Sequence, residues 1–374
     1  MAAISHRLDE DVTLNAIPGA MIVIGNRDRV IFEDCVGFRD VATGDCLGSD
    51  AIWRIFSMTK PIVTVAAMTF VENGLLRLDQ PVADFIPAFG NLRVAQSGGP
   101  DVPAQSAPTI QDLMRHTAGL SYGYLGDSAA HRALEADGFL KEDLPNAAFV
   151  DRLAALPLEY HPGTVWHYSH ATDVLGRILE VIAGHNLQRI LRETLFQPLA
   201  MTETCFHLEA EKRNRVAEPL PQTGLSRSPF FDPCLPRRGQ RSGGGLVSTA
   251  NDYARFLRML LGKGKLDGNR ILSPATIAYM TADHLGRDIR RANYYPPGPG
   301  YGFGLGVAVR LAQGEAPFPG SPGDYFWSGV GGTYFWVDPL HDLFALFMLQ
   351  SSSPDQRLHY RTLMRNMVYA ALDD

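Results

Sequence analysis

The sequence predicts an α+β fold in which both ends of the chain contribute strands to one sheet and the middle forms a helical insertion. Strand-like stretches lie near both termini, whereas the middle is rich in Pro, Gly and short helical patterns. We therefore expect an α/β domain made of residues 1–80 and 240–374 and a mostly helical domain of residues 81–239. The cleft between two such domains is a common place for a substrate site.

Hydrophobic periodicity predicts the first elements. Residues 4–16 have the spacing of a short amphipathic helix. Ala20–Gly25 and Val30–Gly37 indicate a β-hairpin around a polar turn. Met58–Asn73 is apolar almost all round, which favours a central helix, and Ser57 is expected at its N-cap.

Caps and periodicity also place the later elements. Helical spacing predicts three more helices, two of them behind capping residues, and strand-like stretches then return. Ser353-Pro354 begins a last helix, with Pro in its preferred first position. The expected elements are 110–116 behind Thr109 and Asp112, Asp173–Ala183, a helix between Ser248 or Thr249 and Gly262, and strands Tyr301–Arg310, Tyr334–Val337 and Leu343–Gln350.

Composition excludes several classes of protein. The chain has 374 residues, of which 45% are hydrophobic and 20% charged, as in ordinary globular proteins. A formal net charge of −6 does not suit a general nucleic-acid binder. No apolar run reaches the roughly 20 residues of a membrane helix, and the first residues lack a signal-peptide core. With four scattered cysteines expected as free thiols, these features favour a cytoplasmic protein with no nucleic-acid or membrane partner, and the number of subunits stays open.

Ser57-Met58-Thr59-Lys60 is the first candidate for catalytic chemistry. Three residues along a helix place Ser57 and Lys60 on one face, beside the positive end of the helix dipole. Burial and that dipole both lower the pKa of a lysine, and a neutral amine can activate a serine. The alternative is a capping serine with a solvated lysine.

Tyr168-Ser169-His170 is the second candidate. A tyrosine can take the proton of Ser57 if a neighbouring cation lowers its pKa from the ordinary value of about 10. The alternative is a packed tyrosine whose hydroxyl group is only hydrogen-bonded.

Ser121 lies in a different candidate motif, because Gly119-Leu120-Ser121-Tyr122-Gly123 fits G-x-S-x-G, the nucleophile elbow of α/β-hydrolases. That elbow needs a strand before the serine and a helix after it. Here a helix-like segment precedes the serine and a loop follows. We therefore expect Ser121 not to be the nucleophile, and Tyr122 to line the pocket.

Three histidines in the middle of the chain raise the question of a metal site. They are His161, His167 and His170. The sequence has no HExxH motif and no supporting carboxylate pattern around them. We therefore expect no metal at these positions.

The motifs Ser57-Met58-Thr59-Lys60, Tyr168-Ser169-His170 and Trp327-Ser328-Gly329 occur in this order. Together they resemble the serine hydrolases related to class C β-lactamases and penicillin-binding proteins, and most of all the family VIII carboxylesterases. Residues 113–120, 162–164 and 242–249 also look like stretches of those enzymes. The resemblance covers roughly residues 15–370.

This resemblance implies a β-lactamase/transpeptidase-like fold, with an antiparallel sheet flanked by helices and a mostly helical inserted domain. It implies that Ser57 is the acylated nucleophile and that Lys60 and Tyr168 share the general-base work. Tyr168 would return a proton to the leaving alkoxide. The backbone N–H groups of Ser57 and Val330 would form the oxyanion hole. No metal or organic cofactor is implied.

Two positions depart from the family pattern. The peptidases and lactamases carry Lys-Thr-Gly where this chain has Trp327-Ser328-Gly329, and an indole cannot hold a substrate carboxylate by charge. His170 stands where Asn is usual, and it can donate a hydrogen bond or simply pack. We expect Trp327, Gly329, Tyr122 and His170 to contact the substrate.

These observations predict a serine carboxylesterase that hydrolyses short- to medium-chain esters through an acyl-enzyme on Ser57. Its partner is then a small-molecule ester. The alternatives are a β-lactam hydrolase or D-amino-acid peptidase, an acyltransferase on the same fold, and a catalytically silent binding protein.

Overall fold

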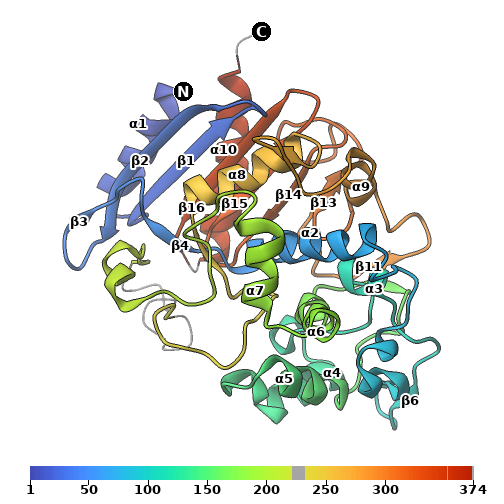
Figure 1. The fold of residues 1–374 in the computed structure, drawn as a ribbon. Coiled ribbons are helices and arrows are strands. Elements are labelled where there is room, and N and C mark those ends of the chain that lie inside the picture. The colour runs from blue at the N-terminus through green and yellow to red at the C-terminus, as the bar shows by residue number, and fades with distance from the viewer. Residues whose placement is uncertain (221–231, 352, 373–374) are drawn as a thin grey trace.

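An eight-stranded antiparallel sheet forms the centre of the protein (Figure 1). The computed structural model describes residues 1–220, 232–351 and 353–372. The strand order is β12-β13-β14-β15-β16-β1-β2-β3, so strands from the two ends of the chain meet. β1 (Gly19–Gly25) pairs with β16 (Leu343–Leu349), with Ala20 opposite Leu349. The expected sheet, built from both chain ends, is confirmed.

The strand expected over Tyr301–Arg310 is wrong, because the segment folds back into two strands. β12 (Tyr301–Phe303) and β13 (Ala308–Arg310) pair across a turn in which Gly306 has φ +81°. This backbone conformation suits glycine, so the Gly-rich sequence permits a reversal where apolar residues suggested continuity. The remaining strands of the sheet are β2 (Val30–Asp40), β3 (Asp45–Cys46), β14 (Tyr325–Ser328), which periodicity did not predict, and β15 (Tyr334–Asp338).

Helices cover both faces of this sheet. α8 (Ala250–Leu261) packs on β16, β1 and β15, whereas α1 (Ala2–Thr13) packs on β2 and against α10 (Pro354–Ala370) (Figure 1). Because both faces are covered, every residue of β1 and β16 is buried, and the strands are apolar throughout rather than alternating. Thr249 caps α8 and Ser353 caps α10, as the sequence indicated.

The regular elements in the middle of the chain are mostly short helices, and two of them lie close to where they were expected. Thr109 and Asp112 form the predicted capping box, although that helix ends at Met114. The helix expected from Asp173 begins two residues earlier. The helices outside the sheet layers are α2 (Thr59–Glu72), α3 (Ile110–Met114), α4 (Ala129–Asp137), α5 (Asn146–Ala154), α6 (Ala171–Ala183), α7 (Leu187–Leu191) and α9 (Pro274–Met280).

Four short strand pairs lie outside the main sheet in the described part of the chain. The pair that matters for the site is β4 (Ile52–Arg54) with β8 (Val247–Thr249), in which Trp53 is opposite Ser248. The other short strands are β5 (Arg93–Val94) with β6 (Val102–Pro103), β7 (Val165–Trp166) with β11 (Arg290–Arg291), and β9 (Lys265–Leu266) with β10 (Asn269–Arg270).

A buried ionic cluster ties the sheet to α10. Asp324 accepts from Arg310 Nε at 2.7 Å and from Arg365 Nη1 at 2.9 Å, and all three side chains are at most 1% exposed. Both guanidinium groups therefore share one carboxylate away from water, where removal of a single partner is costly.

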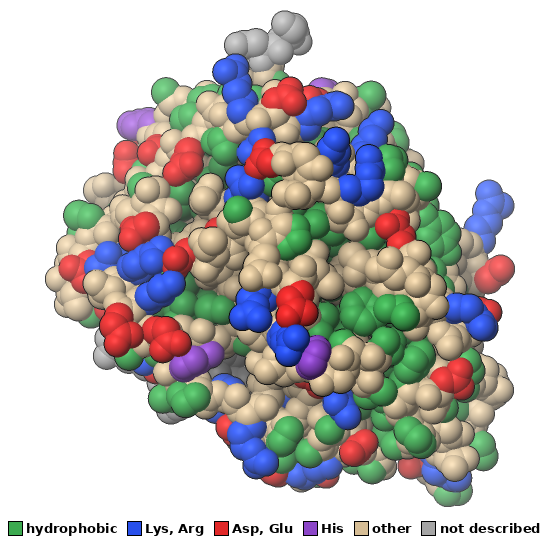
Figure 2. Space-filling model, viewed as in Figure 1, with side chains coloured by type: hydrophobic (Ala, Val, Ile, Leu, Met, Phe, Trp, Pro, Cys, Tyr) green, Lys and Arg blue, Asp and Glu red, His purple; other side chains and the backbone are tan. Residues whose placement is uncertain are grey.

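The outer surface mixes charges of both signs. Figure 2 shows Lys, Arg, Asp and Glu side chains interspersed with apolar ones over the visible face. Within the described residues, none of the helices combines the length and apolar character needed to cross a bilayer.

Candidate active site

Ser57 lies in a tight turn between a strand and a buried helix. β4 leads into a 3-10 turn, Phe56–Met58, and α2 follows at once. The expectation that Ser57 caps this helix is wrong: Met58 is the N-cap residue, and it makes no side-chain cap. The Ser57 hydroxyl group is instead directed to other side chains, described below.

The residue before Ser57 has a strained backbone. Phe56 has φ +45°, a conformation that a bulky aromatic residue rarely adopts and that costs about 1–3 kcal/mol. Glycines make room for it, since a Cβ atom at Gly331 would lie 2.5 Å from the Phe56 ring. The surrounding structure therefore holds the nucleophile candidate in a sharply turned segment.

Three candidate side chains converge on the Ser57 hydroxyl group. The Tyr168 hydroxyl group donates to Ser57 Oγ at 2.7 Å, and Lys60 Nζ lies 3.3 Å from the same oxygen. Lys60 Nζ also lies 4.6 Å from the centre of the Tyr168 ring. The structure thus brings together the residues of the first two sequence motifs, which are 111 positions apart.

Lys60 is poised to be neutral near physiological pH. Its side chain is 1% exposed, and burial lowers the pKa of its amine to about 7, although Asp173 acts in the opposite direction. A neutral amine has two N–H groups and one lone pair. Gly243 O at 2.6 Å and Tyr122 Oη at 3.1 Å take the two N–H groups, which leaves the lone pair for the Ser57 proton.

Tyr168 does not meet the condition set for it as a base. Burial raises its pKa above the ordinary value, even though the Ser57 hydrogen bond acts the other way. The phenol therefore stays protonated and donates to Ser57 Oγ. Of the two base candidates, only Lys60 has a pKa suited to accepting a proton near neutral pH.

The third motif approaches Ser57 from β14. A Cβ atom at Gly329 would lie 2.6 Å from Ile55 O, so only glycine permits this close approach to the segment before Ser57. Val330 follows and is 45% exposed, and its carbonyl accepts from Arg357. Trp327 is buried, with its ring 5.5 Å from that of Tyr168, so it supports the tyrosine from behind.

His170 packs beside the site and is tied to a carboxylate. Its Nδ1 lies 2.9 Å from Asp173 Oδ2, and its ring meets the Tyr122 ring edge-on at 4.1 Å. Its Nε2 is buried and has no hydrogen-bond partner within the described residues. Burial lowers the pKa of His170, so the ring is neutral at physiological pH.

Ser121 belongs to a separate buried network. Its Oγ lies 2.9 Å from His131 Nε2 and 2.7 Å from His167 Nε2, and the residue is only 2% exposed. His131 Nδ1 in turn lies 3.4 Å from Glu159. No strand directly precedes Ser121 within the described chain, so the elbow geometry is not formed.

The three histidines considered as metal ligands do not converge. His167 contacts Ser121 and His170 contacts Asp173, while His161 Nδ1 accepts from a backbone N–H. Among the residues that the structure describes, no cluster of three or more His, Cys, Asp or Glu side chains has metal-binding geometry.

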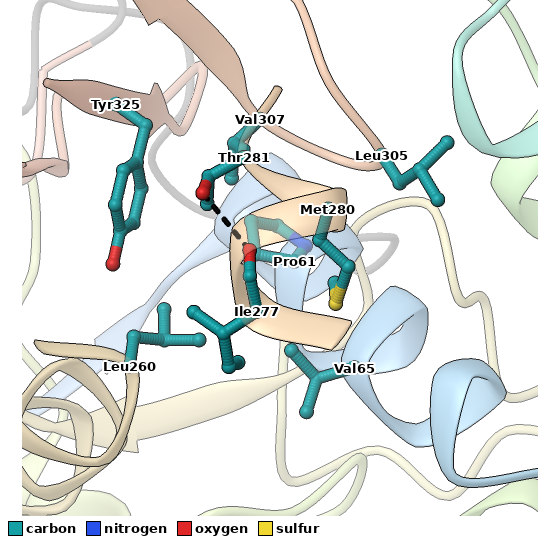
Figure 3. Close-up of a pocket in the computed structure, with 9 residues that line it drawn as sticks. All are labelled: Pro61, Val65, Leu260, Ile277, Met280, Thr281, Leu305, Val307 and Tyr325. Atoms are coloured by element: carbon teal, nitrogen blue, oxygen red, sulfur yellow. Dashed lines mark hydrogen bonds between the residues drawn. The ribbon is translucent and has the colours of Figure 1, made fainter. Parts of the chain in front are cut away.

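Two hollows lie outside this constellation. One is an apolar gap of about 10 Å³ between α2, α8 and α9 (Figure 3). It is lined by Pro61, Val65, Leu260, Ile277, Met280, Thr281, Leu305, Val307 and Tyr325, and the Thr281 hydroxyl group donates to Ile277 O instead of facing a ligand. Such a gap is too small and too apolar to hold a ligand.

The second hollow is a surface groove of about 470 Å³. It is lined in part by Arg291, Tyr295 and Glu315. Tyr295 packs edge-on against Trp166 at 4.7 Å. Neither hollow includes Ser57, Lys60 or Tyr168, so the candidate site is defined by its side chains.

Comparison with known proteins places this geometry in a family. The model of the family described as Beta-lactamase matches residues 4–366. The chain belongs to the beta-lactamase family. The resemblance drawn from the three ordered motifs is confirmed, and so is the fold that it implied.

Two relatives cover most of this chain. Protein Rv1367c of Mycobacterium tuberculosis (strain ATCC 25618 / H37Rv) is 36% identical over an alignment of 350 residues that covers 89% of this chain and 86% of the relative. Esterase EstB of Burkholderia gladioli is 28% identical and covers 99% of this chain, with 96% of its own length matched.

Solved structures show the same architecture. EstCE1, described as a hydrolase with promiscuous acyltransferase activity, has a TM-score of 0.79 at 25% identity, covering 98% of this chain and 97% of its own. Simvastatin synthase (LovD) from Aspergillus terreus has a TM-score of 0.82 at 23% identity, covering 100% and 99%. The second likeness concerns the fold alone.

Sequence reasoning missed two residues of the site. Gly243 supplies a carbonyl to Lys60, and Asp173 accepts the Gly243 N–H at 2.8 Å. Residues 242–249 resemble a stretch of the family, but a backbone acceptor leaves no side-chain signal. The position of Asp173 in the first turn of a helix that starts just after Tyr168 was the available clue.

Proposed function

We propose that this protein is a serine carboxylesterase that hydrolyses short- to medium-chain esters through an acyl-enzyme on Ser57. The observation that carries the proposal is the Ser57 hydroxyl group held at 2.7 Å by the Tyr168 phenol and 3.3 Å from a buried lysine amine. The relation to EstB, named as an esterase, supports ester substrates.

In the acylation step, Ser57 Oγ attacks the ester carbonyl and forms the new C–O bond. Its proton passes to the neutral amine of Lys60, whose lone pair faces it. The tetrahedral intermediate then collapses as the bond to the alcohol oxygen breaks. Tyr168, protonated in the resting enzyme, gives its proton to the leaving alkoxide and is reprotonated from Lys60.

Deacylation reverses these proton movements. Water replaces the alcohol, loses a proton to the Tyr168 and Lys60 pair, and attacks the acyl carbon. The bond to Ser57 Oγ breaks and the serine recovers its proton. We assign the developing negative charge to the backbone N–H groups of Ser57 and Val330, because Gly329 lets that corner approach the turn before Ser57.

The third motif supports neutral esters over β-lactams and peptides with a free carboxylate. Trp327 occupies the position of the lysine in the Lys-Thr-Gly motif and is 3% exposed, so this position offers an apolar surface behind Tyr168. Tyr122 and Gly329 complete the proposed substrate contacts. The role of His170 is to support Tyr122 through ring packing.

Initial rates with p-nitrophenyl butyrate test the proposal. Wild type, Ser57→Ala and Ser121→Ala are compared, since both serines belong to hydrogen-bond networks and Ser57 is the one in contact with Lys60. We expect activity to disappear only in Ser57→Ala. Activity lost only in Ser121→Ala, or absent from the wild type, contradicts the assignment.

Acyl transfer is a second candidate on the same site. EstCE1, at 25% identity, is described as having promiscuous acyltransferase activity beside hydrolysis. If an alcohol replaces water in the second step, increasing methanol diverts p-nitrophenyl butyrate into methyl butyrate. Gas chromatography of the products measures this partition, and a constant yield of butyrate would exclude transfer.

A further inference from the structure

Asp173 and Lys60 contact the two polar ends of one glycine. Asp173 Oδ1 accepts from the Gly243 N–H at 2.8 Å, and the Gly243 carbonyl accepts from Lys60 Nζ at 2.6 Å. Gly243 therefore bridges a carboxylate in the first turn of α6 to the amine beside Ser57. The role proposed above for Lys60 depends on where this carbonyl lies.

Asp173 leaves no room for a side chain at position 243. A Cβ atom at position 243 would lie 2.7 Å from Asp173 Oδ2, nearer than a real Cβ approaches an oxygen. The preceding residue is tied to the same helix end, because Ser242 Oγ donates to Thr172 O at 2.8 Å. Residues at the start of α6 therefore fix the backbone of Ser242 and Gly243, and the Gly243 carbonyl accepts a hydrogen bond from Lys60.

The other carboxylate oxygen of Asp173 is occupied as well. His170 Nδ1 lies 2.9 Å from Asp173 Oδ2, and the buried Nε2 of the ring lacks a partner in the described structure. Because a bare lone pair is less costly to bury than an N–H group, the proton is assigned to Nδ1, which donates to Asp173. Both oxygens therefore hold the carboxylate in one orientation.

We propose that Asp173 is a positioning residue for this esterase: it holds Gly243 so that the Gly243 carbonyl keeps the Lys60 amine between Ser57 and Tyr122. Its charge also acts on that amine across the glycine. This inference rests on the proposed function, in which Lys60 activates Ser57.

The electrostatic surroundings make the charge of Asp173 effective. Burial lowers the pKa of Lys60 and Asp173 raises it, while burial also lowers the pKa of His116 and of His170, so both rings are neutral near pH 7. The facing phenols are Tyr122 and Tyr168, whose pKa values burial raises, so they carry no charge there.

Asp173 itself stays ionised. Burial opposes its charged form, but hydrogen bonding from His170, the charge of Lys60 and the Gly243 N–H hold its pKa below the ordinary range. The Arg241 guanidinium group also faces Asp173, and it lies 4.0 Å above the Phe149 ring. Removal of the carboxylate charge should therefore make Lys60 easier to deprotonate.

Two substitutions separate position from charge. Asp173→Asn keeps an oxygen for the Gly243 N–H but removes the charge. Its amide N–H group faces His170 Nδ1, so the ring must move its proton to Nε2 to accept that hydrogen bond. We expect its kcat at high pH to stay within about threefold of wild type. The acid limb of its kcat/KM profile with p-nitrophenyl butyrate should move to lower pH by about one unit.

Asp173→Ala removes both the acceptor and the charge. We expect kcat to fall by about tenfold or more while KM changes little, because Lys60 is misplaced and the substrate contacts are not. Asp252→Asn is the matched control, since Asp252 is also buried in the first turn of a helix and accepts a backbone N–H, from Glu203 at 2.8 Å. It should keep the wild-type profile.

The outcomes are distinct from those that test the proposed function. A wild-type enzyme that hydrolyses the ester and loses activity in Ser57→Ala supports the function whatever Asp173 does. If the acid limb of Asp173→Asn stays in place or moves to higher pH, the inference is overturned, and the same holds if folded Asp173→Ala keeps the wild-type kcat. If Asp173→Ala does not fold, the pH profile of kcat/KM for Asp173→Asn still tests the inference.

Discussion

At the scale of single residues, the chemistry depends on keeping one amine out of water. Lys60 is enclosed by Gly243, Tyr122 and Ser57, and its burial has a stronger effect on the amine than the neighbouring Asp173. The enclosure lowers the pKa of the amine to about 7, which suits the proposed role of Lys60 as a base. Its protonation state should therefore govern the rate.

The pH dependence of hydrolysis follows from this lysine. The burial-lowered pKa of Lys60 is about 7, so the amine is protonated below that pH and cannot accept the Ser57 proton. We expect kcat/KM with p-nitrophenyl butyrate to rise with pH and to reach half its maximum near pH 7. A profile that is flat from pH 6 to pH 9 contradicts this role.

Tyr168→Phe tests the phenol separately from the ring. The change removes the hydroxyl group that donates to Ser57 Oγ and leaves the contact with Trp327. We expect kcat to fall by about 10²–10⁴-fold with an unchanged melting temperature. Tyr124→Phe is the control, because Tyr124 is 68% exposed and should lose little activity. Near wild-type turnover by Tyr168→Phe would exclude the phenol from proton transfer.

At the scale of elements, the site lies where irregular segments meet regular ones. Ser57 follows β4, Gly329 follows β14, and Asp173 lies in the first turn of α6. Each irregular segment depends on glycine or on a strained residue such as Phe56. Small backbone changes at these junctions should affect activity more than stability.

Gly329→Ala is the sharpest test at this scale. Its added Cβ atom would lie 2.6 Å from Ile55 O, so the corner carrying Val330 must move away from Ser57. We expect kcat for p-nitrophenyl butyrate to fall by about 10²–10³-fold, as for a lost oxyanion-hole donor. Gly90→Ala adds the same atom at an ordinary 3.8 Å contact and should be active. Full activity in Gly329→Ala contradicts the oxyanion assignment.

The elements that the sequence predicted well are those with local signals. The capping box of Thr109 and Asp112 and the Ser353 cap are readable within four residues of chain. The failures had longer-range causes: Gly306 reverses a segment that looks like one strand, and the turn at Ser57 depends on glycines far along the chain. No local pattern could show that Asp173 meets a backbone group 70 positions away.

At the scale of the whole molecule, the core joins the sheet to the helices through apolar packing and one buried ionic cluster. Arg310 comes from β13 and Arg365 from α10, and Asp324, next to β14, binds both. The cluster therefore connects the third-motif strand to the last helix. Its loss should destabilise the fold without altering the side chains around Ser57.

Asp324→Ala should lower the free energy of unfolding by about 3–5 kcal/mol, because it leaves two buried guanidinium groups without their carboxylate. Urea denaturation measures the change. Asp79→Ala, which breaks an exposed pair with Arg77, should have little effect because water screens such pairs. If the two variants have equal urea midpoints, the buried cluster stabilises the fold no more than the exposed pair does.

The pairing of β1 with β16 has a consequence for synthesis on the ribosome. Strand β1 is made early, but its partner on one side is about 330 residues downstream, since Ala20 pairs with Leu349. The apolar edge of β1 therefore stays unpaired while most of the chain is translated. Long-range pairing of this kind is slow, and the unpaired edge is prone to aggregation. Nascent chains that stop before residue 343 lack this closing strand, so chaperone demand should be greatest just before translation ends.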